Sequence, residues 1–132
     1  MRTTSRRRGT AAVELAVCLP VLVIIVLGSI EATNALFLKE RLTASAYEGA
    51  RKASTPNKTS VDATTAAQAV LTQFGVAGGS ITVTPTVGTA TAAGTQITVT
   101  VTAPLSSNSI TRAFIVGKAV STVTAKAVMD HQ

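Results

Sequence analysis

The sequence predicts an α+β fold in which a long N-terminal helix carries a second, shorter helix and a small three-stranded antiparallel sheet. Three observations support this prediction. The first third of the 132-residue chain shows a continuous helical pattern that opens with a strongly apolar run. The second half of the chain changes to valine or isoleucine alternating with threonine, which is typical of half-buried strands. Aromatic residues make up only 3% of the chain, so a large compact core is excluded.

The formal charge of +6 belongs mainly to the first eight residues. Four of the twelve basic residues precede the apolar run, namely Arg2, Arg6, Arg7 and Arg8. Without them, eight basic residues stand against six acidic ones, so the rest of the chain is almost neutral. Because no basic and aromatic surface remains, we expect no nucleic-acid partner.

Residues 10–31 are predicted to form a transmembrane helix. The 22 residues from Gly9 to Ile30 would span about 33 Å as a helix, enough to cross the hydrocarbon core of a bilayer. The four arginines flank the N-terminal side of this run, whereas the charges that follow it nearly cancel. The positive-inside rule therefore predicts a basic cytoplasmic leader over residues 1–9 and export of the chain after residue 31.

Three interpretations of this segment are open: a cleaved secretory signal that releases a soluble domain, a plain single-pass anchor, and a helix with a role in assembly. A secretory signal needs a small-x-small cleavage site, and the chain instead continues as Ser29-Ile-Glu-Ala-Thr-Asn34. A plain anchor explains the length but not Glu14, a carboxylate one turn inside the apolar helix. This carboxylate either reaches back to the lipid headgroups or functions in assembly.

Beyond the membrane, we expect the helix to continue through residues 32–54. Apolar or small residues recur there at helical spacing, at Leu38, Leu42, Ala46, Gly49 or Ala50, and Ala53. A helix over residues 10–53 would be about 65 Å long. That length suits a membrane-rooted stalk or a fibre subunit.

A polar linker over residues 55–59 is expected to end this helix and to lead into a head over residues 60–132. Ser60 is predicted to cap a second helix, with Asp62 in its first turn and Gly75 at its end. The predicted apolar stripe of this helix consists of Ala63, Ala67, Val70, Leu71 and Phe74.

Three strands are predicted after the second helix. The apolar positions of the first two alternate with threonine, and they are Ile81, Val83 and Val87, then Ile97, Val99 and Val101. A loop over residues 88–94 joins these strands, and a loop or short helical turn around residues 108–114 leads to a third strand over residues 119–128. Because the head has only two aromatic residues, we expect its core to lean on residues 38–53 or on neighbouring subunits.

Two stretches of the chain resemble the type IV pilin superfamily, and the similarity is greatest to its TadE-like branch. That branch belongs to the tight-adherence (Tad) pilus system. In the run from Arg6 to Pro20, basic residues are followed by small residues, then Val-Glu, then Leu-Pro. The stretch Ala44-Ser-Ala-Tyr-Glu-Gly-Ala-Arg51 is similar to the family's "REGAR" stretch, with Tyr47 in place of the usual arginine. The resemblance covers roughly residues 6–52.

This resemblance implies a pilin-like fold and a mechanism of assembly. Leu15 stands where Tad major pilins usually carry tyrosine, which favours a minor pseudopilin. A prepilin peptidase would cut after Gly9 and free the amine of Thr10, which replaces the phenylalanine or methionine of conventional pilins. The Glu14 carboxylate would pair with that amine in a neighbouring subunit and set the register. Pro20 would kink or locally melt the helix. This kink is either a neutral feature of a membrane anchor or has a role in assembly.

The partners implied are the membrane, sister pilins or pseudopilins, the prepilin peptidase and the Tad assembly platform, in the cytoplasmic membrane of a bacterium. The alternative is an unprocessed, membrane-anchored envelope module that binds partners through its β head. We expect no catalysis, metal or cofactor, because the chain has no phosphate-binding loop and no metal-ligand cluster. The only histidine, His131, is expected to lie in a disordered chain end, and the single cysteine, Cys18, excludes an internal disulfide.

Overall fold

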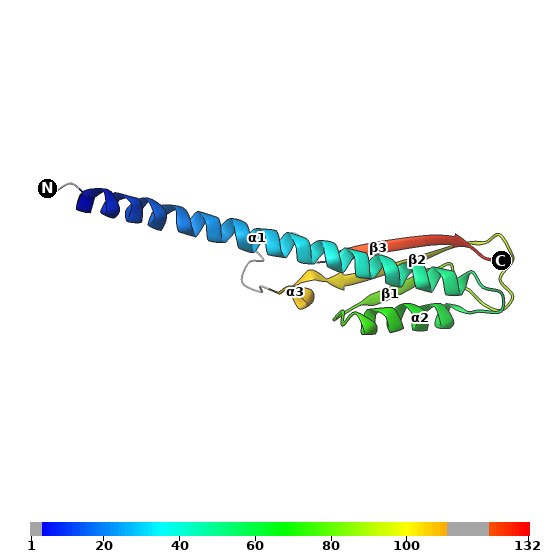
Figure 1. Cartoon of the computed structure of the whole chain (residues 1–132). Coiled ribbons are helices and arrows are strands. Elements are labelled where there is room, and N and C mark those ends of the chain that lie inside the picture. The colour runs from blue at the N-terminus through cyan, green and yellow to red at the C-terminus, as the bar shows by residue number, and fades with distance from the viewer. Residues whose placement is uncertain (1–3, 111–121) are drawn as a thin grey trace.

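A computed structural model describes residues 4–110 and 122–132 and shows a long helix that extends out of an α+β head (Figure 1). The elements in chain order are α1 (Thr4–Ala53), α2 (Ser60–Gln73), β1 (Ser80–Thr84), β2 (Gln96–Pro104), α3 (Leu105–Asn108) and β3 (Thr122–Asp130). The predicted fold class, with its long apolar helix, second helix and three-stranded antiparallel sheet, is confirmed.

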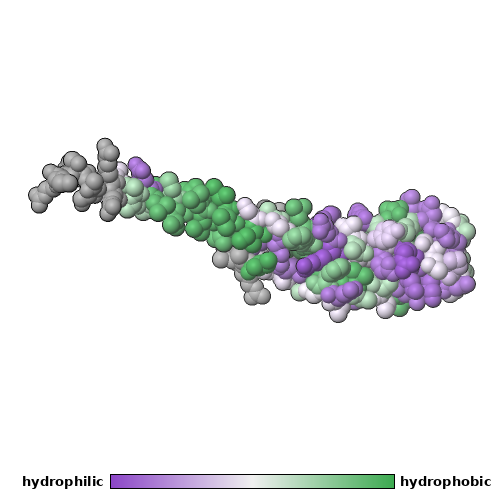
Figure 2. All heavy atoms as spheres, in the orientation of Figure 1, coloured by the Kyte–Doolittle hydropathy of each residue, from purple (hydrophilic) through white to green (hydrophobic). Residues whose placement is uncertain are grey.

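The helix α1 has 50 residues and ends at Ala53, as the sequence predicts. It begins at Thr4, so part of the basic leader and the apolar run form one helix, and it continues through Pro20. Residues 13–30, which we call the apolar half, extend away from the head and give α1 a strongly hydrophobic surface (Figure 2). Residues 38–53, which we call the core half, pack into the head (Figure 1).

The core half buries the predicted stripe of α1. Its buried members are Leu38, Leu42, Ala46, Gly49, Ala50 and Ala53. They pack against residues of α2 and of the sheet in a single hydrophobic cluster. The expectation that the head leans on this helix for its core is therefore confirmed.

The sheet has the strand order β1-β2-β3, and both pairs of strands are antiparallel. Val99 of the central strand lies opposite Val83 of β1 and Ala127 of β3. The alternation predicted for β2 is confirmed, because Ile97 and Val101 are also fully buried. The side chains at these positions join the cluster with α1 and α2, whereas the threonines between them occupy the opposite face of the sheet.

Small residues allow α1 and α2 to approach closely. A Cβ atom at Gly49 would lie 3.1 Å from the Cβ of Ala67 and 3.3 Å from the backbone oxygen of Ala63. The Ser45 hydroxyl is fully buried and donates a hydrogen bond to the backbone oxygen of Ala67 at 2.8 Å. A larger side chain on this face would separate the two helices.

The cap of α2 is one residue earlier than predicted. Thr59 is the N-cap: its hydroxyl accepts the N–H of Asp62 at 3.3 Å, and the Asp62 carboxylate accepts the N–H of Thr59 at 2.9 Å. The hydroxyl of Ser60 instead accepts the N–H of Val87 at 2.6 Å and ties the loop after β1 to α2. The predicted end of the helix at Gly75 is confirmed by its φ of 64°.

The predicted stripe of α2 is only partly buried. Val70 is half-buried, and Phe74 is 43% exposed. Because α2 ends at Gln73, Phe74 lies at the C-cap rather than within the helical stripe. The guanidinium carbon of Arg41 lies 6.0 Å from the centre of the Phe74 ring, at the outer limit of a cation–π contact. The buried members of the stripe are Ala63, Ala67 and Leu71.

The first strand is shorter than predicted. It ends at Thr84, because the next residue, Pro85, has no N–H to donate to the ladder. Val87 is buried as the alternation suggested, but it lies in the loop rather than in β1.

The third strand is described from Thr122 to Asp130, so it ends two residues later than predicted. Of the predicted strand, residues 119–121 lie outside the described residues. A short helix, α3, precedes the loop or helical turn expected around residues 108–114, since it ends at Asn108, and residues 109–110 are not helical. Residues 111–114 of that prediction also lie outside the described residues.

The prediction that His131 lies in a disordered end is wrong. Its side chain is buried, and its Nδ1 atom lies 2.9 Å from the backbone oxygen of Ala53, to which it donates because a carbonyl can only accept. The N–H of His131 bonds to Thr95 at 2.8 Å, and the N–H of Gln132 bonds to Ser54 at 3.0 Å. The last carbonyls of α1 have no partner within the helix, so the chain end supplies one.

Candidate membrane and assembly surface

Large aliphatic side chains are exposed on all sides of the apolar half of α1. Their exposed fractions range from 40% at Ile30 to 70% at Val17. Over the described residues, α1 is the one helix that is long and apolar enough to cross a membrane. A helix that is apolar all round normally lies in a core or in a bilayer, and the head does not cover this half.

The residues predicted for cleavage and assembly lie on the exposed part of α1. Gly9 and Thr10 are exposed, and among the described residues nothing beyond the neighbouring backbone of α1 lies within 4 Å of the position of a Cβ on Gly9. Glu14 is also exposed and lies one helical turn after Thr10, so both groups can be reached from the same side of the helix. Pro20 is exposed within the continuous helix.

The predicted topology signal falls at the edge of the described chain. Arg2 lies outside the described residues. The backbone of α1 includes Arg6, Arg7 and Arg8, but their side chains lie outside the described part.

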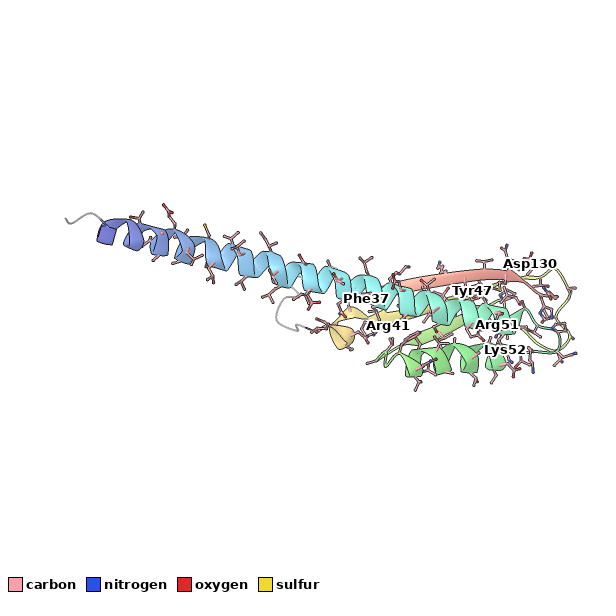
Figure 3. All side chains as sticks on the ribbon, in the orientation of Figure 1. Phe37, Arg41, Tyr47, Arg51, Lys52 and Asp130 are labelled. Atoms are coloured by element: carbon pink, nitrogen blue, oxygen red, sulfur yellow. The ribbon has the colours of Figure 1, made fainter. Side chains whose placement is uncertain are left out.

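The second stretch of the resemblance forms the contact between α1 and α2. Within residues 44–51, the side chains of Ser45 and Ala46 are buried on the face toward the head, and Tyr47 is exposed. Figure 3 shows Tyr47 and Arg51 on the part of α1 that lies along the head. The small residues of this stretch thus have a packing role.

An ion pair lies on the solvent side of this stretch. The Arg51 guanidinium donates two hydrogen bonds to the Glu48 carboxylate, at 2.6 and 2.9 Å. The hydrogen bond from Arg51 lowers the pKa of the Glu48 carboxyl below its ordinary value. This pair is largely exposed, so it supports the helix only weakly.

A second carboxyl with a shifted pKa belongs to the cap of α2. The backbone N–H and the hydroxyl of Thr59 both donate to the Asp62 carboxylate, each at 2.9 Å, and they lower the pKa of Asp62. The shift therefore reports a structural cap rather than acid–base chemistry.

The groove between α2 and β1 offers few groups for chemistry. This shallow groove of about 860 Å³ is lined by Thr64, Thr65, Gln68, Ala69, Thr72, Gln73 and Ile81. This lining contains neither an ionisable side chain nor a metal-binding group. Across residues 4–110 and 122–132, no three His, Cys, Asp or Glu side chains come together as a metal site would require.

Several polar residues that join separate parts of the chain were not predicted from the sequence, and two of them stand out. One is His131, discussed above, and the other is Asn108, whose side chain bonds to the backbone of Ala77 and Pro104. No sequence signal marks Asn108, because the surrounding Ser-Ser-Asn-Ser run resembles any polar loop. A histidine near a chain end is equally uninformative until the strand that carries it is placed.

A comparison with protein-family models shows what most of α1 is similar to. Residues 9–51 match the family model described as TadE-like protein. The N-terminal region is TadE-like. The match covers the apolar half and most of the core half, so the resemblance inferred from the sequence is confirmed for this region. Comparisons with curated proteins and with solved structures gave no significant match.

Proposed function

We propose that this protein is a TadE-like pseudopilin that serves as a minor subunit or assembly factor of a Tad-type pilus or secretion apparatus. It crosses the bacterial cytoplasmic membrane once, with the N-terminus in the cytoplasm and the head exported. One observation carries the proposal: the TadE-like helix α1 uses its core half within its own head and leaves its apolar half uncovered. Lipid covers this half before assembly, and sister helices cover it afterwards.

In this proposal the leader is removed by a prepilin peptidase after Gly9. The open surroundings of Gly9 support this step, because a protease must approach the backbone there. Cleavage frees the amine of Thr10, and the exposed Glu14 carboxylate of a neighbouring subunit pairs with it in apolar surroundings. Pro20 provides a point at which the helix adapts its packing between membrane and fibre.

The processing step is tested by the intact mass of the membrane form, with and without a prepilin peptidase. The proposal predicts a mature chain that starts at Thr10 only when the peptidase is present. Gly9→Val should block cleavage, whereas the matched variant Gly28→Val, at another open glycine of the same helix, should be processed normally. A chain that still begins at Met1 with active peptidase would refute processing.

The assembly role is tested by Glu14→Leu. We expect this variant to insert into membranes normally, as measured by resistance to alkaline extraction, but to lose co-assembly with sister pilins. The matched variant Glu40→Leu changes another exposed glutamate of α1 and should assemble normally. If Glu14→Leu retains all partner contacts, the alternative of an unprocessed envelope module that recruits partners through its head is favoured instead.

A further inference from the structure

The turn that follows α3 is fixed to the end of the apolar half of α1. Asn34 on α1 donates a side-chain hydrogen bond to the backbone oxygen of Asn108 at 2.8 Å. The Ser109 hydroxyl donates to the Glu31 carboxylate at 2.6 Å. These two bonds place the turn at residues 108–110 beside the first helical turn after Ile30.

The head holds the same turn from the other side. The Asn108 side chain exchanges two hydrogen bonds with the backbone of Ala77, both at 2.9 Å, and donates a third to Pro104 at 2.8 Å. The turn is therefore clamped between α1, the end of β2 and the loop before β1. Hydrogen bonds therefore hold the turn in a fixed position relative to the apolar half of α1.

The residue that this clamp presents is strongly apolar. Ile110 is 71% exposed, and it borders a hollow of about 270 Å³ together with Ile30 and Phe37 of α1. The rest of the lining consists of Ser29, Thr33 and Asn34. Figure 3 shows Phe37 where α1 reaches the head. Apolar surface thus continues from the apolar half onto the base of the head.

The depth of this surface follows from helix geometry. If the span ends near Ile30, residues 31–34 rise about 6 Å above the hydrocarbon edge. The polar headgroup region adds roughly 5 to 7 Å on each side of the hydrocarbon core. The turn that carries Ile110 is bonded to residues 31 and 34, so Ile110 would lie within the headgroup region, close to the hydrocarbon edge.

We propose that the turn at residues 108–110 is a second membrane contact, in which Ile110 enters the boundary between lipid headgroups and acyl chains. The proposal rests on the proposed membrane anchor. The occupant is lipid because the patch is continuous with the lipid-facing surface and is bordered by neutral hydroxyl and amide groups that suit headgroups. Together with the transmembrane span, this contact sets the distance of the head from the bilayer and the rotation of the molecule about the axis of α1.

The test uses single-tryptophan variants of the full chain, which has no natural tryptophan. They are reconstituted into phosphatidylcholine–phosphatidylglycerol vesicles with or without brominated acyl chains. Ile110→Trp should lose most of its fluorescence in brominated lipid. Val61→Trp, at a residue 72% exposed on α2, should lose none, and Leu22→Trp in the apolar half should be strongly quenched.

Further variants separate the clamp from simple proximity. Adding Asn34→Ala to Ile110→Trp should reduce the quenching, because the bond to Asn108 is lost. Adding Thr43→Ala should not, because the Thr43 hydroxyl donates to the backbone oxygen of Lys39 within α1 and this residue does not line the hollow.

The outcomes distinguish the two proposals. If Leu22→Trp is quenched and Ile110→Trp is not, the second membrane contact is refuted while the anchor stands. If Leu22→Trp also keeps its fluorescence, the anchor and the contact both fail. Emission from Ile110→Trp that escapes bromine and changes with the protein-to-lipid ratio would show that a second copy of the chain covers the patch, which also overturns the proposal.

Discussion

Both halves of α1 are helical, but their apolar residues differ in size and in exposure. The apolar half carries leucine, isoleucine and valine on every side, and all of them from Val13 to Val26 are exposed. The core half carries a single stripe rich in alanine and glycine, which is buried against α2 and the sheet. One continuous helix therefore has two different surroundings.

The difference shows how residue size follows the kind of contact. Around the core half, backbone approaches backbone, so Gly49 and Ala67 leave no room for larger groups. Around the apolar half, the surroundings must adapt to large side chains, as lipid does. The core half is thus buried in the head of its own chain. The apolar half is exposed and needs a membrane or other chains to cover it.

The largest effect that would separate the two halves comes from a matched pair of leucine truncations. Leu42→Ala removes a fully buried side chain and should lower the free energy of unfolding of the head by about 2 to 5 kcal/mol. Leu22→Ala removes an exposed one and should change it by less than about 0.5 kcal/mol. Urea unfolding of the full chain in micelles measures both. Equal losses would mean that the apolar half also packs within the chain.

A smaller effect is expected where the chain end closes the core half. His131→Ala leaves the backbone oxygen of Ala53 buried without its donor, which should cost about 1 to 3 kcal/mol. Gln132→Ala keeps the backbone bond to Ser54 and changes an exposed side chain, so it serves as the control. The same unfolding measurement applies. If the two variants are equally stable, the ring of His131 does not support the end of α1.

The smallest of these effects concerns the cap of α2, which packs on the core half only. Thr59→Ala should cost about 1 kcal/mol, because one N–H of the first turn loses its acceptor. Thr65→Ala, at an exposed threonine of the same helix, is the control. If Thr59→Ala also reduced insertion of the chain into membranes, the apolar half and the core half would not be independent.

The same cap predicts a dependence of stability on pH. The pKa of Asp62 is lower in the folded chain than in the unfolded chain, because Thr59 donates hydrogen bonds to the carboxylate. Its stabilisation is therefore complete above the unfolded pKa and is lost as the pH falls through the folded pKa. Asp62→Asn should remove this part of the acid-dependent loss. An unchanged acid profile in Asp62→Asn would mean that the carboxylate does not stabilise the cap.

The sequence predicted the parts of the fold that repeat a regular pattern. The stripe from Leu38 to Ala53 and the alternation in β2 could be read directly, because burial on one side imposes a fixed period. The end of β1 at Thr84 follows from Pro85, whereas the alternation alone extends the strand to Val87. The exchange of roles between Thr59 and Ser60 could not be seen, since either hydroxyl can cap a helix and only the tertiary bond to Val87 decides between them.

The candidate site was predictable only where local spacing carries the chemistry. Gly9, Thr10 and Glu14 stand out because their spacing suits cleavage and pairing at one helix end, and their roles stay predictions. The clamp at Asn108 and the bond from His131 to Ala53 join residues that lie 74 and 78 positions apart from their partners. Contacts at such separations leave no mark in a single sequence.

The central claim is that lipid, not water, surrounds the apolar half, and the natural Cys18 tests it most directly. This cysteine is the only one in the chain, and its side chain is exposed on α1. In vesicles with a charged, membrane-impermeant maleimide on both sides of the bilayer, Cys18 should react far more slowly than the cysteine of a Cys18→Ala/Val61→Cys variant. Equal rates at the two positions would contradict the account.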